Sequence, residues 1–193
     1  MEHLELFTDG GAMKIGDKIY GSSSFVIRYH NTYFTYTEPV SEGSSGMFEL
    51  NAIKNGLQTI VRNWSDLKNL EVWIISDSQN SIACISNIFD VWKKTNGIYK
   101  NKHGKEVAYI DILLDIKKSL SQLSNYKFIK IKSHIDTDVE KTYDEFLEKN
   151  EVNISFIEYL MMIRHNERCD NKITSEFNYK RKELAKEKGV DVI

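Results

Sequence analysis

The feature that most constrains the fold is a continuous apolar run in the middle of the chain, Val72-Trp73-Ile74-Ile75. Such a run suits a strand that is buried on both faces, as in sheets covered by helices on two sides. Before it, the first forty residues are rich in aromatic and β-branched residues with Gly, Asn and Asp in the gaps, which is typical of an antiparallel meander. After it, helix and strand patterns alternate. The order βββαβαβ, with an extra helix, therefore predicts a mixed α/β sheet flanked by helices.

Composition and charge exclude several classes of protein. Of the 193 residues, 41% are apolar and 28% are charged, which is typical of a globular chain and not of a disordered or fibrous one. This length predicts a single domain over residues 1–193. Because the net charge is −2, the protein is not a uniformly basic nucleic-acid coat, and any contact with nucleic acid requires a local basic patch.

The sequence also indicates a compartment. No apolar run approaches the ~20 residues that cross a bilayer, and the first residues lack the basic and apolar regions of a secretory signal. The two cysteines, Cys84 and Cys169, are too few for a disulfide framework or a Cys-rich zinc site. We therefore expect a cytoplasmic protein without a membrane segment.

Hydrophobic periodicity predicts where the elements lie. Strands are expected at 4–8, 18–29, 31–40, 70–76 and 126–132, and helices at 47–63, 78–89, 107–123 and 164–188. The acid-rich stretch 135–164 is interpreted as an insertion that holds one or two helices. The stretch 93–105 carries lysines and a histidine but no acid, which makes it the candidate basic patch.

Two acids follow predicted strands. Asp9 is expected to end the first strand, before two glycines, and Asp77 directly follows the strand that contains residues 72–75. Ligands gather at the carboxyl ends of strands in open α/β sheets. Each acid also has an ordinary interpretation, because Asp-Gly is common in turns and because Asp77 or Ser78 could cap the next helix.

Two further acids lie on helix faces that are otherwise apolar. Glu49 continues a stripe with Ile53 and Leu57. Asp170 lies in line with Ile173 on the last predicted helix. A carboxylate on a core-facing stripe costs several kcal/mol unless it is paired or binds a cation. The alternatives are a glutamate that favours the helix dipole and a surface aspartate paired with a lysine.

These four carboxylates can share one site only if cations offset their mutual repulsion. Oxygen ligands select hard cations such as Mg²⁺ or Mn²⁺. Two such ions, about 4 Å apart, are the usual means of cleaving a phosphodiester bond. The predicted metal ligands are Asp9, Glu49, Asp77 and Asp170.

With these motifs, the sequence resembles ribonuclease H of type 1 over residues 1–134 and 165–187. The acids match the family's motifs as Phe-Thr-Asp-Gly-Gly around Asp9, Met-Phe-Glu-Leu around Glu49, Ser-Asp-Ser-Gln around Asp77, and Asn-Glu-Arg-Cys-Asp ending at Asp170. The family's Lys-Gly-His segment resembles Lys132-Ser133-His134, and its basic protrusion resembles the stretch that begins Val91-Trp92-Lys93-Lys94. The family usually has Thr-Asn-Asn where this chain has Ser44-Ser45-Gly46.

The resemblance implies a ribonuclease H-like fold, with a five-stranded mixed sheet and a helical insertion before the last helix. It implies hydrolysis of the RNA strand of RNA–DNA hybrids by two Mg²⁺ ions, with Mn²⁺ as an alternative, leaving 5′-phosphate and 3′-hydroxyl ends. The four acids would be the catalytic residues, together with His134 on a loop, for which His165 is a rival. The implied substrate-binding residues are Gly10, Gly11, Ser44, Ser45, Gln79, Trp92, Lys93, Lys94, Lys100, Lys102 and Asn166.

Two other functions stay open. One is a nuclease of the same fold that acts on branched DNA; such an enzyme is normally a dimer, whereas no dimer face is evident and we expect a monomer. The other is a non-catalytic module that binds hybrids. The four acids argue against this module, because a binding protein gains nothing from their repulsion.

Overall fold

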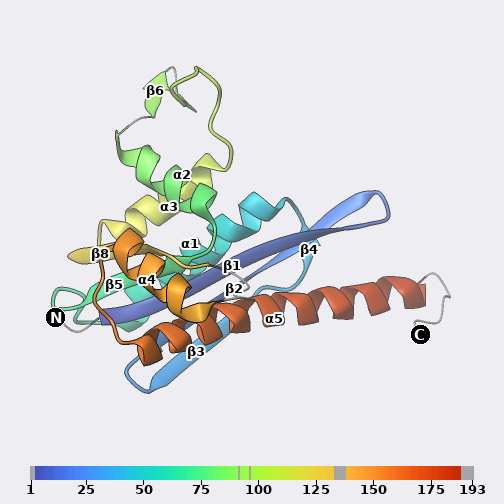
Figure 1. Cartoon of the computed structure of the whole chain (residues 1–193). Coiled ribbons are helices and arrows are strands. Elements are labelled where there is room, and N and C mark those ends of the chain that lie inside the picture. Colours follow the sequence, from blue (N-terminus) through green and yellow to red (C-terminus); the bar gives the residue numbers. More distant parts are fainter. Residues whose placement is uncertain (1–2, 91, 96, 133–137, 188–193) are drawn as a thin grey trace.

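The computed structural model describes residues 3–90, 92–95, 97–132 and 138–187. A mixed sheet forms its centre, and helices cover both faces (Figure 1). The strands are β1 (His3–Ile15), β2 (Lys18–Tyr29), β3 (Thr32–Thr37), β4 (Ser41–Glu42), β5 (Glu71–Ser76), β6 (Lys93–Thr95), β7 (Ile98–Lys100) and β8 (Asn125–Lys130). The helices are α1 (Ser45–Asn63), α2 (Gln79–Asp90), α3 (Ile110–Leu120), α4 (Val139–Asn150) and α5 (Phe156–Glu187).

The sheet has the predicted mixed topology. Its strand order is β3-β2-β1-β5-β8, with antiparallel pairing among β1, β2 and β3 and parallel pairing of β5 with β1 and β8. The prediction of five strands in a mixed sheet is therefore confirmed. Two features go beyond it: the short β4 pairs with β2, and β6 and β7 form a separate hairpin.

The first strand continues well past its predicted end. We expected it to stop at Asp9, where two glycines follow, but β1 pairs with β2 as far as Ile15, opposite Lys18. The chain turns instead at Gly16, whose φ of 62° is a value that glycine adopts without strain. Asp9 thus lies inside a strand and not at its end, so the turn interpretation of Asp9 is wrong.

The glycine that follows Asp9 marks the place where α1 comes closest to the sheet. A Cβ at Gly10 would lie 2.1 Å from the backbone nitrogen of Glu49 and 2.3 Å from the carbonyl carbon of Phe48. On the neighbouring β2, a Cβ at Gly21 would lie 2.2 Å from the Phe48 ring. The two missing side chains therefore let the first turns of α1 lie directly against β1 and β2.

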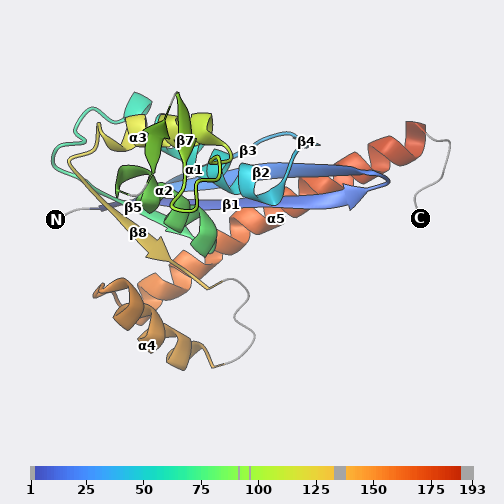
Figure 2. The same cartoon turned by 90° about the horizontal axis from the view of Figure 1, so that it is seen from above.

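Each face of the sheet carries its own apolar core, because alternate side chains of a strand point to opposite faces. One core lies under α1, α2 and α3 and includes Leu6, Leu57 and Leu113. The other lies under α4 and α5 and includes Phe7 and Tyr159. Figure 2 shows these two helical layers on opposite sides of the strands. Residues 72–75 of β5 are buried on both faces, as their unbroken apolar run predicted.

The last helix begins earlier than predicted. We expected a separate insertion at 135–164 and a helix from 164, but α5 is continuous from Phe156 to Glu187. Neither Gly nor Pro occurs between residues 156 and 187, so the sequence contains no residue that would break the helix. Of the predicted insertion, α4 and the first two turns of α5 lie within the described residues, and 135–137 lie outside them.

None of the helices in the described ranges has the length and apolar character that a bilayer crossing requires. The single-domain organisation of residues 1–193 stays a prediction.

We predict that Gly10→Ala lowers the free energy of unfolding by about 3 kcal/mol, because its Cβ would overlap backbone atoms of α1, which cannot rotate away. Gly46→Ala is the matched control. The nearest atom to a Cβ at Gly46, on Tyr109, is 4.0 Å away, so alanine should add about 0.5–1 kcal/mol through helix propensity. Urea unfolding followed by circular dichroism measures both changes. An unchanged midpoint for Gly10→Ala would contradict the close approach of α1.

Candidate active site

Two acids lie side by side on adjacent parallel strands. In the register of β1 and β5, Thr8 lies opposite Ser76, so the next residues, Asp9 and Asp77, fall at the same level of the sheet. The Thr8 hydroxyl donates to the Ile75 carbonyl at 3.2 Å and ties the two strands together just before the acids. The register of the sheet thus sets the separation of the two carboxylates.

The helix after Asp77 is capped by another residue. The Ser78 hydroxyl accepts a hydrogen bond from the Ser81 amide at 3.3 Å, and the Ser78 carbonyl accepts one from the Ile82 amide at 3.2 Å. Because Ser78 satisfies these amides, the Asp77 carboxylate is not needed to cap α2. Asp77 remains at the carboxyl end of β5, where its side chain can serve the site.

The first turns of α1 bring the third acid to the same point. Ser44 caps the helix through a hydrogen bond that its hydroxyl accepts from the Met47 amide. Farther along the stripe, Ile53 and Leu57 are fully buried, whereas Glu49 is half-buried where α1 meets β1 at Gly10. The amphipathic pattern and the close approach together place Glu49 above the strands.

These three side chains form a close acidic cluster. Carboxylate oxygens of Asp9, Glu49 and Asp77 lie within 4.8 Å of one another. Burial, followed by the charges of Asp9 and Asp77, raises the pKa of Glu49 to about 9, although Lys130 opposes this shift. The cluster is therefore under electrostatic strain that a bound cation would relieve.

Asp170 lines the same pocket from α5 but lies outside that close cluster. Its neighbour Cys169 is fully buried, with its thiol 3.8 Å from the Phe7 carbonyl oxygen. Burial raises the pKa of the Cys169 thiol, so it stays neutral and serves as an anchor for the helix. Asn166, one turn earlier, lines the pocket as well and is 4% exposed. The structure thus brings three of the four predicted acids together and places the fourth at the rim.

The residues present fit a hard divalent cation. All donors in the cluster are carboxylate oxygens, which suit Mg²⁺ or Mn²⁺ better than softer metals. Among the described residues, the buried Oε2 of Glu49 and Oδ1 of Asn166 have no hydrogen-bond partner. Within the same residues, no other three acid, histidine or cysteine side chains bring ligand atoms this close together. The acidic cluster could therefore hold a metal ion.

Lys130 is a site residue that the sequence analysis missed. It lies opposite Ser76 in the register of β5 and β8, so its side chain points to the α1 face, from which Glu49 enters. Burial lowers the pKa of Lys130, while Asp77 and Glu49 act in the opposite direction. Its signal in the sequence is a lysine within the otherwise apolar run Phe128-Ile129-Lys130-Ile131.

The backbone of Lys130 is held by α4. The Asn150 side chain accepts from the Lys130 amide at 2.7 Å and donates to the Lys130 carbonyl at 3.0 Å. Through these two hydrogen bonds, Asn150 pairs with the edge strand β8 as a residue of a further strand would. Its side chain is 7% exposed. The helix α4 thus fixes a positive charge beside the acids.

The predicted substrate-binding residues near the cluster have mixed positions. Gly10 and Gly11 line the acidic pocket, and Ser45 and Gln79 are exposed at the N-terminal ends of α1 and α2. Ser44 has a structural role, because its hydroxyl caps α1 and lies 2.5 Å from the hydroxyl of Tyr109. Tyr109 is 39% exposed and has no counterpart in our sequence predictions.

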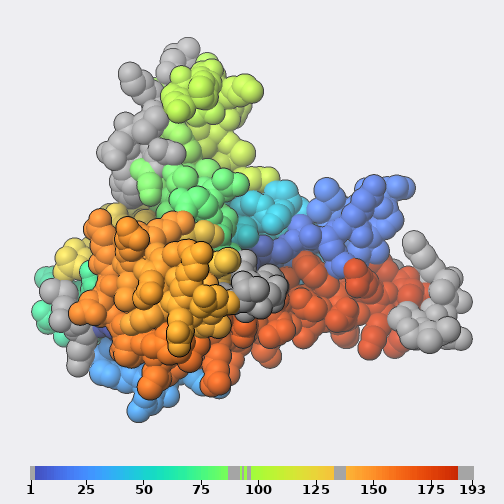
Figure 3. Space-filling model, viewed as in Figure 1, coloured from blue at the N-terminus to red at the C-terminus, as the bar shows by residue number. Residues whose placement is uncertain are grey.

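The predicted basic patch forms the β6–β7 hairpin, which projects from the body of the protein (Figures 1 and 3). Lys94, Lys100 and Lys102 are exposed, and the Lys94 ammonium lies 5.5 Å from the centre of the Tyr99 ring. Trp92 is half-buried and packs against the core under α1, α2 and α3, so it supports the base of the hairpin. The neighbouring Lys93 begins β6.

The predicted catalytic histidine, His134, lies outside the described residues. Its rival, His165, packs between the rings of Phe7 and Tyr33, with ring centres 5.1 and 5.7 Å away. Burial, followed by the charges of Arg28 and Arg168, lowers the pKa of His165 to about 4, so this ring is neutral at pH 7. His165 is not among the described residues that line the acidic pocket. The structure gives His165 a packing role, and the role of His134 stays a prediction.

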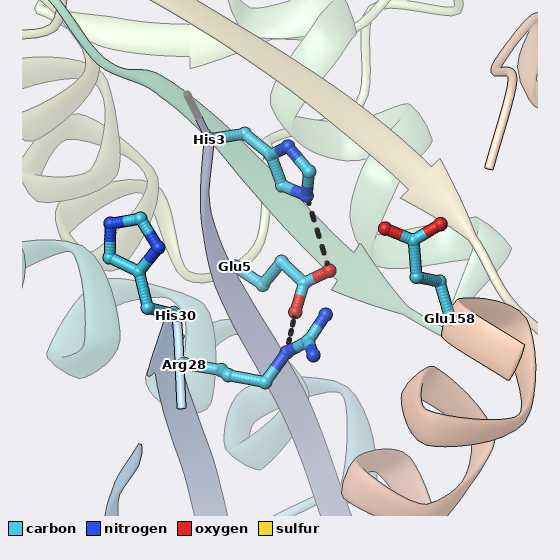
Figure 4. A pocket seen from close by; sticks show the side chains of 5 residues that line it. All are labelled: His3, Glu5, Arg28, His30 and Glu158. Carbon is cyan, nitrogen blue, oxygen red and sulfur yellow. Dashed lines mark hydrogen bonds and ion pairs between the residues drawn. The ribbon is translucent and has the colours of Figure 1, made fainter. Parts of the chain in front are cut away.

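A second polar pocket lies at the start of β1 and is lined by His3, Glu5, Arg28, His30 and Glu158 (Figure 4). The Glu5 carboxylate accepts a hydrogen bond from Arg28 and lies 3.4 Å from Nε2 of His3. Burial alone would raise the pKa of Glu5, but the hydrogen bonds from His3 and Arg28 outweigh it and lower that pKa. The buried charge is therefore paired, and we interpret it as a structural link between β1 and β2.

Comparison with protein families gives one match that spans most of the chain. The family model described as RNase H matches residues 1–177, a range that includes all four acids. A comparison with curated proteins found no match.

Several solved structures share the fold. The N-terminal RNase H domain of a Mycobacterium tuberculosis protein, fused to maltose-binding protein, is 15% identical with a TM-score of 0.50, and the match covers 75% of this chain and 95% of that one. LC11 RNase H1 in complex with an RNA/DNA hybrid is 18% identical with a TM-score of 0.51, with 74% and 92% covered. The foamy viral protease–reverse transcriptase in complex with an RNA/DNA hybrid is 14% identical with a TM-score of 0.54, with 79% and 20% covered. These matches confirm the predicted ribonuclease H-like fold.

We predict that Glu49→Gln stabilises the metal-free protein by an amount that grows as the pH rises. The folded-state pKa of Glu49, about 9, lies above its ordinary value of 4.5. Between these values ionisation favours the unfolded chain, so the wild type loses at most about 1.4 kcal/mol per pH unit, whereas glutamine cannot ionise. Urea unfolding in EDTA from pH 4 to pH 8.5 measures the difference.

The exposed Glu148→Gln is the control and should follow the wild type. Near pH 4 the Glu49→Gln variant and the wild type should differ little. If their stabilities stay parallel up to pH 8.5, burial and the neighbouring acids do not raise the pKa of Glu49 as described.

Proposed function

The chain belongs to the RNase H family, and we propose that it is an endonuclease that hydrolyses the RNA strand of RNA–DNA hybrids. The observation that carries this proposal is the acidic cluster of Asp9, Glu49 and Asp77, at the motif positions of that family. The hybrids bound by LC11 RNase H1 and by the foamy viral enzyme support the same substrate class.

The proposed mechanism uses two divalent cations, Mg²⁺ with Mn²⁺ as an alternative. When bound, such cations would supply activation of a water molecule and stabilisation of the leaving oxygen, and we expect 5′-phosphate and 3′-hydroxyl ends. Asp9, Glu49 and Asp77 would hold them, and Asp170 would complete the ligand set from the rim of the pocket. The positive charge of Lys130 would offset part of the negative charge of Asp77 and Glu49. His134 is our candidate for proton transfer near the site.

Selection of RNA would come from the groups around the pocket. The 2′-hydroxyl distinguishes RNA from DNA at a given position. Gly10 and Gly11 line the pocket, so their backbone groups are available to a ribose there. Gln79 is exposed beside it, at the start of α2. We propose that these three residues contact the RNA strand near the cleavage point.

The β6–β7 hairpin would hold the DNA strand of the hybrid. Phosphate contacts from lysine supply most of the affinity of a protein for nucleic acid. Because the whole chain has a net charge of −2, this affinity has to come from a local surface. The exposed Lys94, Lys100 and Lys102 offer such a surface at a distance from the acids.

We predict that Asp77→Asn keeps the fold and slows hybrid cleavage by at least about 10³-fold, because removal of a metal ligand costs several kcal/mol of transition-state stabilisation. The exposed Asp115→Asn on α3 is the matched control and should cut at the wild-type rate. A gel assay with a labelled hybrid and Mg²⁺ measures both rates. Wild-type turnover by Asp77→Asn would remove this residue from the site.

The substrate is tested with three labelled nucleic acids: a uniform hybrid, duplex DNA and a branched DNA junction. We expect cleavage of the RNA strand of the hybrid in Mg²⁺ and none in EDTA. Cleavage of the junction in preference to the hybrid would favour a nuclease for branched DNA. Binding of the hybrid without cleavage in Mg²⁺ or Mn²⁺ would favour a non-catalytic module.

We predict that the triple variant Lys94→Gln, Lys100→Gln, Lys102→Gln raises KM about tenfold at low salt and flattens the salt dependence of KM, with little change in kcat. The control replaces three exposed lysines elsewhere, Lys68, Lys118 and Lys141, by glutamine. Steady-state cleavage at several salt concentrations measures both variants. Equal effects of the two triple variants would contradict a specific role of the hairpin.

A further inference from the structure

The outer face of α5 carries a row of positive side chains that the proposed function does not use. Positions 164, 168, 172, 175, 179, 182 and 186 recur at intervals of three or four residues, which is the spacing of one helix face. Five of them are basic and define what we call the basic stripe: Arg164, Arg168, Lys172, Lys182 and Lys186. At 1.5 Å per residue, the stripe is about 33 Å long.

The basic stripe faces away from the sheet. The opposite side of α5 is buried, for example at Met162, Cys169 and Ile173. In contrast, four of the five basic residues are exposed, and Arg168 is half-buried. In Figure 1, α5 runs along one edge of the protein and continues beyond the sheet toward the C-terminus. The stripe is therefore available to a partner along most of its length.

The charge along this face has one sign. No acid occupies positions 164, 168, 171, 172, 175, 179, 182 or 186 of the described helix, and Asn171 and Ser175 add uncharged donors. The nearest acids, Glu167, Glu176 and Glu183, flank the stripe. Glu167 lines the same depression as Arg164 and Arg168, and Glu183 is paired with Lys180. A protein with a net charge of −2 thus concentrates positive charge on one surface, which favours a polyanion as partner.

Two exposed aromatic rings lie along the basic stripe. Tyr179 is on the stripe face and is 69% exposed. Tyr33, on the edge strand β3, is 56% exposed, and the Arg168 guanidinium lies 4.1 Å from the centre of its ring. Positive side chains with interleaved aromatic rings are the combination that binds single-stranded nucleic acid, because phosphates contact the charges and bases stack on the rings. An acidic protein as partner would need only the positive charges, so the rings favour nucleic acid as the partner.

This surface adjoins the acidic pocket, but its basic residues do not line that pocket. The α5 residues that line the pocket include Asp170, Thr174 and Phe177, and none of them belongs to the basic stripe. A shallow depression along the stripe is lined by Arg164, Arg168 and Lys172, and it meets the acidic pocket at Glu167, which lines both. The β6–β7 hairpin also belongs to another part of the molecule, beyond α2 and α3 (Figure 1). A nucleic acid on the stripe would therefore not occupy the pocket.

We propose that the basic stripe of α5, together with Tyr179 and Tyr33, is a second nucleic-acid-binding surface that takes single-stranded nucleic acid. This proposal does not rest on the proposed cleavage, because binding to the stripe needs neither metal nor the acids. For a hybrid with a single-stranded tail, it gives the protein a second point of attachment.

The test measures binding of a fluorescein-labelled single-stranded DNA of 20 thymidines to the full chain in EDTA, by fluorescence anisotropy. The triple variant Arg164→Gln, Lys172→Gln, Lys182→Gln should bind at least tenfold more weakly and reduce the slope of log K against log salt by roughly 2. Tyr179→Ala should weaken binding about fivefold or more through lost base stacking. The control triple variant Lys68→Gln, Lys118→Gln, Lys141→Gln should bind as the wild type does.

Two further measurements distinguish single-strand binding at the stripe from misfolding of the variant and from unspecific attraction of polyanions. The stripe variant should keep the circular dichroism spectrum and the urea unfolding midpoint of the wild type, which demonstrates that it folds. If the wild type cleaves a blunt hybrid, the stripe variant should cleave it at the same rate. Binding of blunt duplex DNA and of polyglutamate to the wild type and to the stripe variant is measured in the same way. The proposal is overturned if the stripe variant binds the single strand with wild-type affinity, or if duplex DNA or polyglutamate depends on the stripe as strongly as the single strand does.

Discussion

The crowding of three acids, Asp9, Glu49 and Asp77, at one partly buried point is the constraint on which the rest of the structure depends. Three acids within 4.8 Å of one another oppose folding unless the surrounding chain holds them in place. The register of β1 with β5 fixes Asp9 beside Asp77, and the close approach of α1 at Gly10 fixes Glu49 above them. Functional sites commonly lower the free energy of unfolding of the protein that contains them.

Helix α5 connects the site to the rest of the protein. Its inner face anchors the helix to the sheet through Cys169 and Ile173, and an adjacent side brings Asp170 to the rim of the acidic pocket. Its outer face carries the basic stripe. On the other side of the site, α4 holds the strand end at Lys130 through Asn150. The segment that we interpreted from the sequence as an insertion thus supports the site at its edge.

The sequence allowed the fold class to be predicted, because its signals are local. The four acids were selected as a set, of which the structure brings Asp9, Glu49 and Asp77 together and places Asp170 in the same pocket. An unbroken apolar strand at 72–75 and a glutamate on an apolar helix stripe need no tertiary information. The length of β1 could not be predicted in this way, because the glycines after Asp9 resemble a turn. Tertiary packing accounts for them instead, since α1 lies against Gly10 and α5 lies against Gly11. The start of α5 at Phe156 could have been found, since no Gly or Pro interrupts residues 156–187. Lys130 was missed because its proximity to Glu49 arises from the pairing of β8 with β5.

The central claim is that acids far apart in the sequence jointly bind divalent cations, and anomalous scattering from a crystal soaked in Mn²⁺ tests it most directly. Our account predicts anomalous peaks between the carboxylates of Asp9, Glu49 and Asp77, with Asp170 close enough to share one of them. It also predicts that these peaks disappear in crystals of Asp77→Asn. Ordered carboxylates with no manganese between them, at millimolar Mn²⁺ and neutral pH, would contradict the account.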